Sequence, residues 1–294
     1  MYKLLKSLGV VSKDLYAEPM NPKTQATANT AGESVTFDLP TDQLLYWIDL
    51  KVAKDTDASL VSNITEIELK LDGSKVVRNL SGAMLRAMNI YDHNKGSTGF
   101  YRLPIALPEL GADPIPLNQF SSCTLKVTVA AAGDSTKNVV TPVLQLGARQ
   151  SYPKLGDLGL GKVLVETFLP QKSYLTNIGE QEYEHMKAND VIGYLYELGD
   201  NNVLSDTAIS YLTLELRNKT GKLTPCSKVP LAQIKEWNTI EANGNALGTG
   251  MFYLPFPDTI RTSDYTTVKS LLNIASAGTN VQARVLERYL LGGV

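Results

Sequence analysis

The sequence predicts an all-β protein made of two similar antiparallel sandwiches in tandem, and two observations lead to this prediction. Runs of five to nine residues with strand-like patterns dominate the chain, as in ITEIELKL at residues 64–71. Alternation of apolar and polar side chains with a period of two is typical of half-buried strands. In addition, one unusual phrase is written twice, as GFYRLPI at residues 99–105 and as GMFYLPF at residues 250–256. Such a repeat indicates an internal duplication.

Other landmarks of the first half recur in the same order in the second half. An alternating strand is followed by a polar turn, a segment with helical apolar spacing, a glycine-containing loop, the repeated phrase and two further strands. The helical segments end at Asn89 and Asn238. The alternating strands are residues 64–71 and 209–216, the strands after the phrase are 124–129 and 269–274, and the last strands are 142–146 and 283–291.

Each duplicated unit has the texture of a jelly roll. About eight short strands in roughly 110 to 130 residues suit a sandwich of two antiparallel sheets, and long connections favour a jelly roll over a simple meander. The sequence therefore predicts two tandem eight-stranded antiparallel jelly-roll sandwiches, each with a short inserted helix, plus an N-terminal arm or helix. The predicted boundaries are residues 1–34 for the arm, 35–149 for the first jelly roll, 150–162 for a linker and 163–294 for the second jelly roll.

The linker contains one motif that points to a different function. Residues 156–162, GDLGLGK, match the G-x-x-x-x-G-K pattern of a phosphate-binding loop. That loop leads from a strand into a helix, and a Ser or Thr follows its lysine. Here Val163 follows, and VLVETFL predicts a strand. An interdomain linker is the preferred interpretation.

Charge and cysteine content exclude several classes of protein. The chain has 28 Lys and Arg against 30 Asp and Glu, a formal net charge of −2, and neither sign is concentrated enough for a nucleic-acid channel. We expect no sequence-specific nucleic-acid partner. Cys123 and Cys226 form neither a disulfide framework nor a metal-binding pattern, so buried free thiols are expected.

The first 14 residues, MYKLLKSLGVVSKD, have the pattern of a short amphipathic arm. The apolar run is too short to span a membrane and lacks a small-residue cleavage site, so no signal peptide is predicted. Two interpretations stay open: an arm that touches a membrane surface or a neighbouring subunit, and an arm that packs on its own domain. The candidate inter-subunit or membrane-facing residues are Lys3, Leu4, Leu5, Lys6, Leu8 and Lys13.

No pattern in the sequence predicts catalysis, a cofactor or a metal site. His93 and His185 are expected to be exposed, and no HxH or HExxH spacing is present. No GxSxG elbow occurs. The acidic run Glu180, Glu182 and Glu184 is interpreted as solvated, and Asp200-Asn201-Asn202 as a turn and not a calcium loop. The chain is therefore predicted not to be an enzyme.

The duplicated strand order, the helix in each half, the Leu-Pro strands and the N-terminal arm resemble the double jelly-roll major capsid proteins. This lineage joins adenoviruses to tailless, membrane-containing phages such as tectiviruses and corticoviruses. The resemblance extends over residues 35–291 and includes no signature motif. It implies a structural subunit that forms pseudo-hexameric homotrimers, which tile an icosahedral shell with or without an internal membrane beneath it.

The resemblance also implies partners and a location. The partners would be neighbouring capsomers, penton and minor capsid proteins and the surface of an internal viral membrane; the location would be the virion, after assembly in the host cytoplasm. Two alternatives stay open: a two-jelly-roll amidase that releases glycans, and a carbohydrate-binding or fibre protein. Either would need exposed indoles, and Trp47 and Trp237 both lie within predicted strand or helix patterns.

Overall fold

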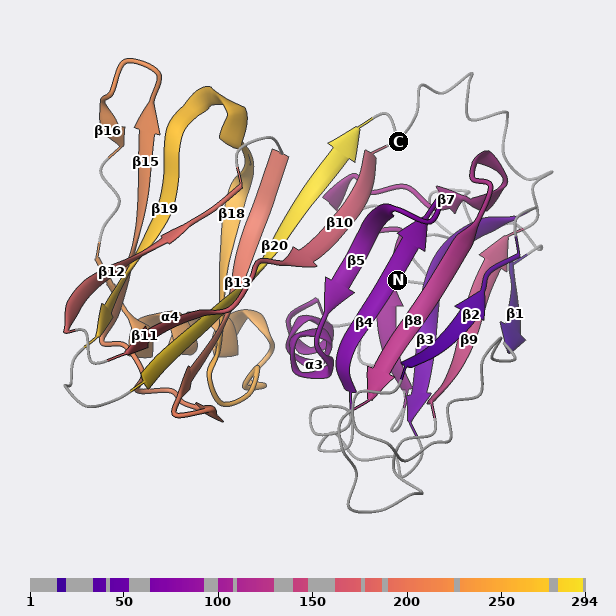
Figure 1. Cartoon of the computed structure of the whole chain (residues 1–294), viewed down its shortest axis with the longest axis horizontal. Coiled ribbons are helices and arrows are strands. Elements are labelled where there is room, and N and C mark those ends of the chain that lie inside the picture. Colours follow the sequence, from indigo (N-terminus) through magenta and orange to yellow (C-terminus); the bar gives the residue numbers. More distant parts are fainter. Residues whose placement is uncertain are drawn as a thin grey trace. The chain divides into compact units, whose positions relative to one another are not determined.

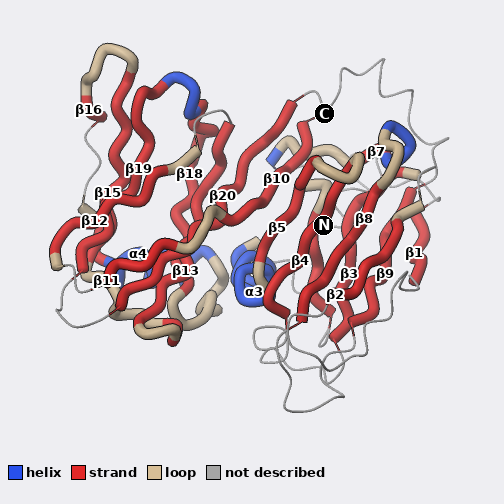
Figure 2. Tube along the Cα trace, viewed as in Figure 1, coloured by secondary structure: helices blue, strands red, loops and turns tan. Residues whose placement is uncertain are grey.

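A computed structural model of the chain describes residues 15–19, 34–40, 43–52, 64–92, 100–107, 110–129, 140–147, 162–175, 178–186, 190–224, 228–274 and 280–292. The chain forms two compact units. Met1–Asn89, Asn94–Leu164 and Leu291–Val294 form the first unit, and Ile90–His93 and Val165–Leu290 form the second. Most of the described residues lie in strands, as Figure 2 shows, and the fold is all-β as predicted.

Two antiparallel sheets build the first unit (Figure 1). One sheet has the order β1-β9-β3-β6, and the other contains the neighbours β2-β8-β4-β5. The short β7, Ile115–Pro116, adds to β3. The bounds in the first sheet are Leu15–Pro19 for β1, Val140–Gly147 for β9, Leu44–Val52 for β3 and Phe100–Pro104 for β6; in the second they are Ser34–Asp38 for β2, Cys123–Val129 for β8, Ile64–Leu71 for β4 and Lys75–Leu80 for β5.

The second unit repeats this arrangement. Its sheets contain the neighbours β10-β20-β13-β18 and β12-β19-β15-β16. Short strands extend them: β11 (Lys172–Leu175) pairs with β20, β14 (Val203–Leu204) with β13, and β17 (Val229–Pro230) with β15. The bounds are Lys162–Phe168 for β10, Asn280–Gly292 for β20, Asp190–Asp200 for β13, Met251–Arg261 for β18, Gly179–Glu184 for β12, Tyr265–Ile274 for β19, Tyr211–Asn218 for β15 and Leu223–Thr224 for β16.

The connectivity of the two units is the same. If the eight main strands of each unit are ranked by their order in the chain, both units have one sheet with the order 1-8-3-6 and one with the order 2-7-4-5. This is the connectivity of a jelly roll. The helices α3 (Gly82–Tyr91) and α4 (Leu231–Glu241) both lie between the fifth and the sixth main strand. The predicted duplication is therefore confirmed strand by strand.

The duplication extends to individual residue pairs. Trp47 is paired with Pro104 in the first unit, and Gly193 with Pro255 in the second. A β-bulge immediately precedes Trp47 and Gly193 in their strands. A proline lacks the N–H for a ladder bond and is expected at a strand end; this is so for Pro104, whereas β18 continues to Arg261 and Pro255 ends only the first stretch of its pairing with β13.

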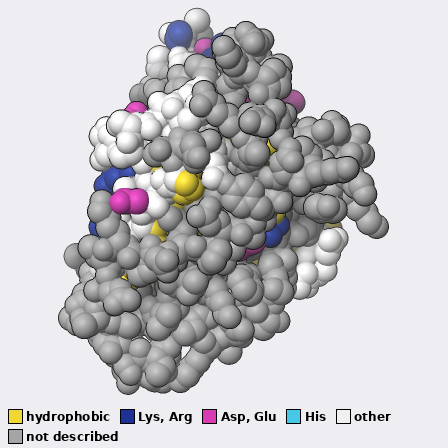
Figure 3. Space-filling view, turned by 90° about the vertical axis from the view of Figure 1, so that its right-hand side faces the viewer, with side chains coloured by type: hydrophobic (Ala, Val, Ile, Leu, Met, Phe, Trp, Pro, Cys, Tyr) yellow, Lys and Arg dark blue, Asp and Glu magenta, His cyan; other side chains and the backbone are white. Residues whose placement is uncertain are grey.

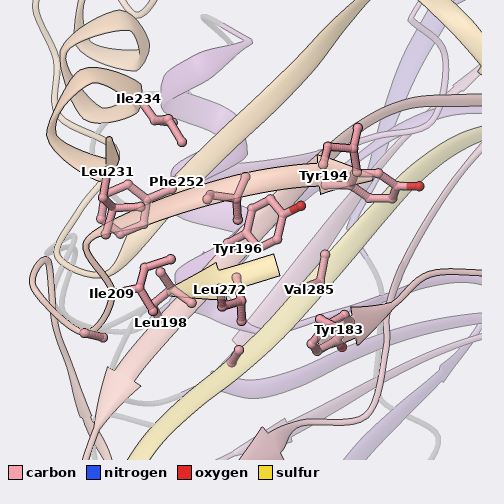
Figure 4. Packing of buried hydrophobic residues seen from close by; sticks show 14 of the residues in the cluster. Tyr183, Tyr194, Tyr196, Leu198, Ile209, Leu231, Ile234, Phe252, Leu272 and Val285 are labelled. Atoms are coloured by element: carbon pink, nitrogen blue, oxygen red, sulfur yellow. The ribbon is translucent and has the colours of Figure 1, made fainter. Parts of the chain in front are cut away.

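Aromatic and aliphatic side chains fill the core of the second unit (Figure 4). Tyr183, Tyr194 and Tyr196 are almost completely buried there, together with Phe252 from the repeated phrase. Tyr101 in the first unit and Tyr253 in the second are buried as well, so these aromatic side chains of the phrase belong to the core, whereas Phe256 is partly buried. Burial of one large apolar side chain contributes about 1.5 to 3 kcal/mol to the free energy of folding, so these side chains stabilise the packing of their strands in each sandwich.

The structure adds one strand that the sequence did not indicate. Residues Leu15–Pro19 pair with β9, although they lie within the range predicted as the arm. Alternating apolar side chains are the signal for a strand, and LYAEP is too short to show them. The linker residues 150–161 lie outside the described residues, and Lys162 begins β10, so the predicted strand after the GDLGLGK motif is confirmed.

Candidate functional surfaces and buried polar clusters

An asparagine at the end of each helix fixes the helix to the repeated phrase. In the first unit the Asn89 amide donates to the Arg102 carbonyl at 2.6 Å and accepts from the Arg102 N–H at 2.8 Å. In the second unit Asn238 makes the same two bonds with Tyr253, at 2.7 and 2.8 Å. We call this arrangement the asparagine clamp. It establishes that Asn89 and Asn238 are equivalent positions, as are Arg102 and Tyr253.

A buried arginine organises a second polar cluster, which lies in the second unit. Arg288 on β20 donates from Nε to Glu166 at 2.8 Å and from Nη2 to Asp92 at 2.7 Å. Its Nη1 donates to the Tyr253 hydroxyl at 3.2 Å. Burial by itself would lower the pKa of Arg288, but Asp92, Tyr253 and Glu166 outweigh it and raise the pKa well above its usual value. Arg288 is therefore a fixed positive charge inside the fold.

A third cluster has the composition of a catalytic triad. Nε2 of His185 lies 2.7 Å from Oγ of Ser270, and Nδ1 lies 3.3 Å from Oε1 of Glu287. The His185 ring stacks on Tyr194 at 3.9 Å between centroids, and the Tyr196 hydroxyl lies 2.6 Å from the same Ser270 Oγ. Serine, histidine and a carboxylate in this order are the groups of nucleophilic hydrolases.

Burial excludes a catalytic role for this cluster. Ser270, His185 and Glu287 are all buried, and Ser270 is 0% exposed, so a substrate carbonyl has no access to the hydroxyl. The side chains of His185 and Glu287 are both 0% exposed, so the cluster is closed to substrate on the histidine side as well. The expectation that His185 is exposed is wrong: the EYEHMK segment looks polar, but β12 directs Tyr183 inward and His185 follows on the same side of the chain.

We expect His185 to make the stability of the protein depend on pH. Burial lowers the pKa of His185, and the attraction of Glu287 opposes this shift only in part. The unfolded chain therefore takes up a proton near pH 6.5 that the folded chain refuses, and the free energy of unfolding should fall as pH drops below about 6.5, by about 1.4 kcal/mol for each unit over which only the unfolded state is protonated. Urea unfolding at pH 7.5 and 5.5 measures the slope.

The control for this slope is the variant His185→Gln. It removes the titrating group and keeps an amide that can bond to Ser270, so its stability should change less between the two pH values than that of the parent chain. An identical slope in both chains would show that other groups cause the pH dependence.

The outer face of α4 exposes apolar side chains. Trp237 is 45% exposed and Ile240 64% exposed, and Glu236 and Glu241 are exposed beside them. The asparagine clamp makes Met88 the equivalent of Trp237 in the first unit, and Met88 is only 1% exposed. Sequence placed Trp237 within the apolar face of its helix with Leu231 and Ile234. These two are buried, but Trp237 points to solvent.

A partly exposed aromatic and charged patch lies on the first unit. The Arg102 guanidinium lies 4.4 Å above the Trp47 ring, a cation–π distance, and forms a bidentate ion pair with Asp49 at 2.8 and 2.9 Å. The Trp47 indole N–H donates to the same Asp49 at 3.2 Å. We call these three residues the Trp47 patch. Nothing in the sequence indicated it, since Trp47, Asp49 and Arg102 come from two strands.

The sequence-predicted site residues are distributed as follows. The arm residues Lys3, Leu4, Leu5, Lys6, Leu8 and Lys13 lie outside the described residues, as do His93 and Cys226. Cys123 is a buried free thiol, and burial together with Asp72 raises its pKa to about 11. Asp200 precedes the turn of the β13–β14 hairpin, in which Asn201 and Asn202 adopt positive φ angles, so the turn interpretation is confirmed.

Charged side chains on the acidic run form surface ion pairs. Glu180 lies 2.8 Å from Lys228, and Glu182 is paired with Lys269. Figure 3 shows acidic, basic and apolar side chains interspersed on the described part of one face. Among the described residues no group of three or more His, Cys, Asp or Glu is arranged to hold a metal ion, and no described helix is long and apolar enough to cross a membrane.

Comparison with known proteins agrees with this architecture. Residues 21–151 match the family model of the viral coat protein P2 N-terminal domain. The fold is similar to the major capsid protein P2 of bacteriophage PM2, with 13% identity, TM-score 0.66 and coverage of 95% of this chain and 98% of that one. A search of curated protein sequences gives no match.

Two further capsid structures are similar over nearly the whole chain. The structure of Sulfolobus Turreted Icosahedral Virus matches with 11% identity, TM-score 0.71 and coverage of 94% of this chain and 90% of that one. The PBCV-1 virus capsid matches with 9% identity, TM-score 0.60 and coverage of 94% and 93%. The predicted resemblance to double jelly-roll major capsid proteins is confirmed, and the findings favour a capsid structural subunit over an enzyme.

Proposed function

We propose that this capsid structural subunit is a major capsid protein, three copies of which close into a pseudo-hexameric capsomer that tiles an icosahedral virus shell. The observation that best supports this function is the duplication. Each chain contributes two jelly rolls with the same strand order and the same asparagine clamp. Three chains about a threefold axis supply six near-equivalent units, and a ring of six tiles a curved shell.

The proposal also includes the partners that the capsomer contacts in the virion. Neighbouring capsomers, penton and minor capsid proteins are the expected protein partners, and an internal viral membrane is the expected lipid surface, in a virion assembled in the host cytoplasm. We further propose that the arm of residues 1–34 and the C-terminal segment RYLLGGV, residues 288–294, serve these contacts, with 35–149 and 163–294 as the folding domains joined by the linker 150–162. The lysines and leucines of the arm, residues 3–13, would face the membrane or a neighbouring capsomer.

The rival functions require a sugar-binding surface. Trp237 offers one exposed indole on α4, the kind of residue that a glycan-binding site needs. In the part of the chain that the structure describes, the pocket lined by Glu197, Asn202 and Arg284 on the second unit contains no indole. The family match of the first half to a coat protein favours the capsid function over an amidase or a carbohydrate-binding protein.

Mass measurement tests the proposal. Purified full-length chain should give a species of about three times 32.0 kDa by light scattering, and this species should assemble into shells. Deleting residues 1–14 should leave the trimer intact and impair shell assembly or binding to anionic vesicles. A stable monomer that releases or binds glycans would contradict the proposed function, and loss of the trimer on deletion would show that the arm belongs to the fold.

A further inference from the structure

We propose that the end of α4, formed by Trp237, Ile240 and Glu241, docks on the Trp47 patch of a second copy of this chain. This inference rests on the proposed function and names the contact that would join the chains of one trimer. Light scattering and cross-linking distinguish the loss of this contact from the loss of the trimer itself.

The second unit already contains one docked helix end, that of α3. The last two residues of α3 and the following Asp92 belong to that unit. The Tyr91 ring packs edge-on against Tyr253, with 4.5 Å between centroids, and Asp92 pairs with Arg288 at 2.7 Å. The second unit thus holds one apolar and one acidic residue of a helix end on its sheet residues Tyr253 and Arg288.

The end of α4 is equivalent in position to the end of α3. Because the clamp aligns Asn89 with Asn238, Tyr91 corresponds to Ile240 and Asp92 to Glu241. The apolar residue followed by an acidic residue is therefore present at the end of α4 as well. Ile240 is 64% exposed, and Glu241 is exposed too. The helix end of the second unit is chemically similar to that of α3, but both of its residues are exposed in the described part of the structure.

The Trp47 patch is the surface of the first unit that we propose receives this helix end. The pairing register places Arg102 where the second unit has Tyr253, and Trp47 where it has Gly193. The Trp47 patch is thus the counterpart of the surface that receives Tyr91 and Asp92. Its charged members are only partly buried, with side-chain exposures of 24% for Arg102 and 20% for Asp49. The first unit has a receiving surface, and the second unit has a free helix end.

The chemistry of the two surfaces is complementary. Ile240 and Trp237 offer apolar area to the Trp47 indole, and aromatic residues with arginine are the usual anchors of protein interfaces. Glu241 offers a carboxylate to Arg102, which already uses Nε and Nη2 on Asp49 but carries five N–H donors. Arg288 shows that one guanidinium in this fold accommodates two carboxylates, Glu166 and Asp92.

Symmetry identifies the occupant as a second copy. A helix end on one unit and a receiving surface on the other make a head-to-tail contact, and head-to-tail contacts form a closed ring when the rotation between neighbours is a whole fraction of a turn, as in the proposed trimer. The described residues offer one exposed helix end and one partly exposed patch of this kind, and a contact between two chains leaves one of each for a third chain. A glycan on Trp237 would instead leave the Trp47 patch without a role.

Substitution of Ile240 tests the helix end. Ile240→Asp places a charge against the indole, and we expect association at this contact to weaken by roughly 30-fold or more, the effect of removing an interface anchor. The matched control is Val203→Asp, which is 68% exposed on β14. Light scattering over a concentration series should show Ile240→Asp dissociating to monomer where the control and the parent chain remain trimeric.

A cysteine pair tests the partner surface. The pair Ile240→Cys and Arg102→Cys is used at concentrations where the parent chain is trimeric. A thiol-reactive cross-linker that spans two side chains should then give linked dimers and trimers on a denaturing gel, because the side chains of the equivalent Tyr91 and Tyr253 are in contact. Each single cysteine variant is the control and should give monomers. Cross-linked species should be absent when the double variant is first diluted below the concentration at which trimers form and is cross-linked only afterwards.

The outcomes separate the two proposals. Trimers that tolerate Ile240→Asp and give no cross-link overturn this inference and leave the proposed function standing. A parent chain that is monomeric at every concentration and assembles no shells overturns the proposed function and the inference with it. Glycan binding that Trp237→Ala abolishes without effect on a trimer would also overturn the assignment of α4.

Discussion

Replacing Arg288 with alanine should lower the free energy of unfolding by about 3 to 5 kcal/mol. The side chain is buried between Glu166 and Asp92, and its removal leaves carboxylates without a compensating charge in a low-dielectric site. Desolvation of an unpaired carboxylate is what makes such a site costly. The shift of the urea midpoint, followed by tryptophan fluorescence, measures the effect.

Arg284 provides the matched control for this variant. It lies four residues earlier on the same strand, is partly exposed, and contacts Glu197 at 3.5 Å. Arg284→Ala should therefore cost less than about 1 kcal/mol, the usual range for surface pairs. If unpaired charge is the cause, Arg288→Met combined with Glu166→Gln should recover part of the loss. Equal effects at Arg284 and Arg288 would contradict the assignment of a buried charge cluster.

Replacing Asn238 with alanine should destabilise the protein by about 2 to 4 kcal/mol, since each unsatisfied buried polar group costs about 1 to 3 kcal/mol. The variant leaves the N–H and the carbonyl of Tyr253 without their partners and loosens α4 from β18. Asn89→Ala should have a similar effect in the first unit, because Asn89 makes the same bonds to Arg102. Urea unfolding of both variants tests whether the two clamps are equivalent in energy as well as in geometry.

A suitable reference for the clamp is Asn273→Ala on β19. The Asn273 amide donates to the Ser210 hydroxyl at 2.6 Å in an exposed position, where water replaces the lost partner. This variant should change the free energy of unfolding by less than about 1 kcal/mol. A clamp variant as mild as Asn273→Ala would show that the backbone of the repeated phrase finds other partners when the asparagine is absent.

The strands and helices that the sequence predicts correctly are those with a local periodic pattern of apolar side chains. The strand ITEIELKL became β4, the equivalent run in the second half became β15, and each helical segment appeared between the same two strands. Period-two alternation reports directly on the two faces of a strand. The repeat of GFYRLPI and GMFYLPF was sufficient to align the two halves without a structure.

The candidate site was not predictable in the same way, because it depends on pairs of distant residues. Asp49 and Arg102 meet through strand pairing, and Asp92 and Arg288 are 196 positions apart. Helical spacing grouped Trp237 with Leu231 and Ile234, but it gives no measure of how much of this face of α4 is covered, and only Leu231 and Ile234 are buried. His185 was misjudged for a related reason, since polar neighbours in the chain do not reveal whether the two sheets enclose a side chain.

The near-identity of backbone pairing in the two jelly rolls limits exchange between them. Gly193 and Trp47 are each paired with the proline of the repeated phrase, but the Tyr253 side chain leaves no room even for a Cβ at Gly193. Gly193 is therefore locked to Tyr253, and Trp47 to Arg102. A side chain copied from position 47 to position 193 would therefore overlap with Tyr253, so the two jelly rolls cannot exchange these residues although their backbone pairing is the same.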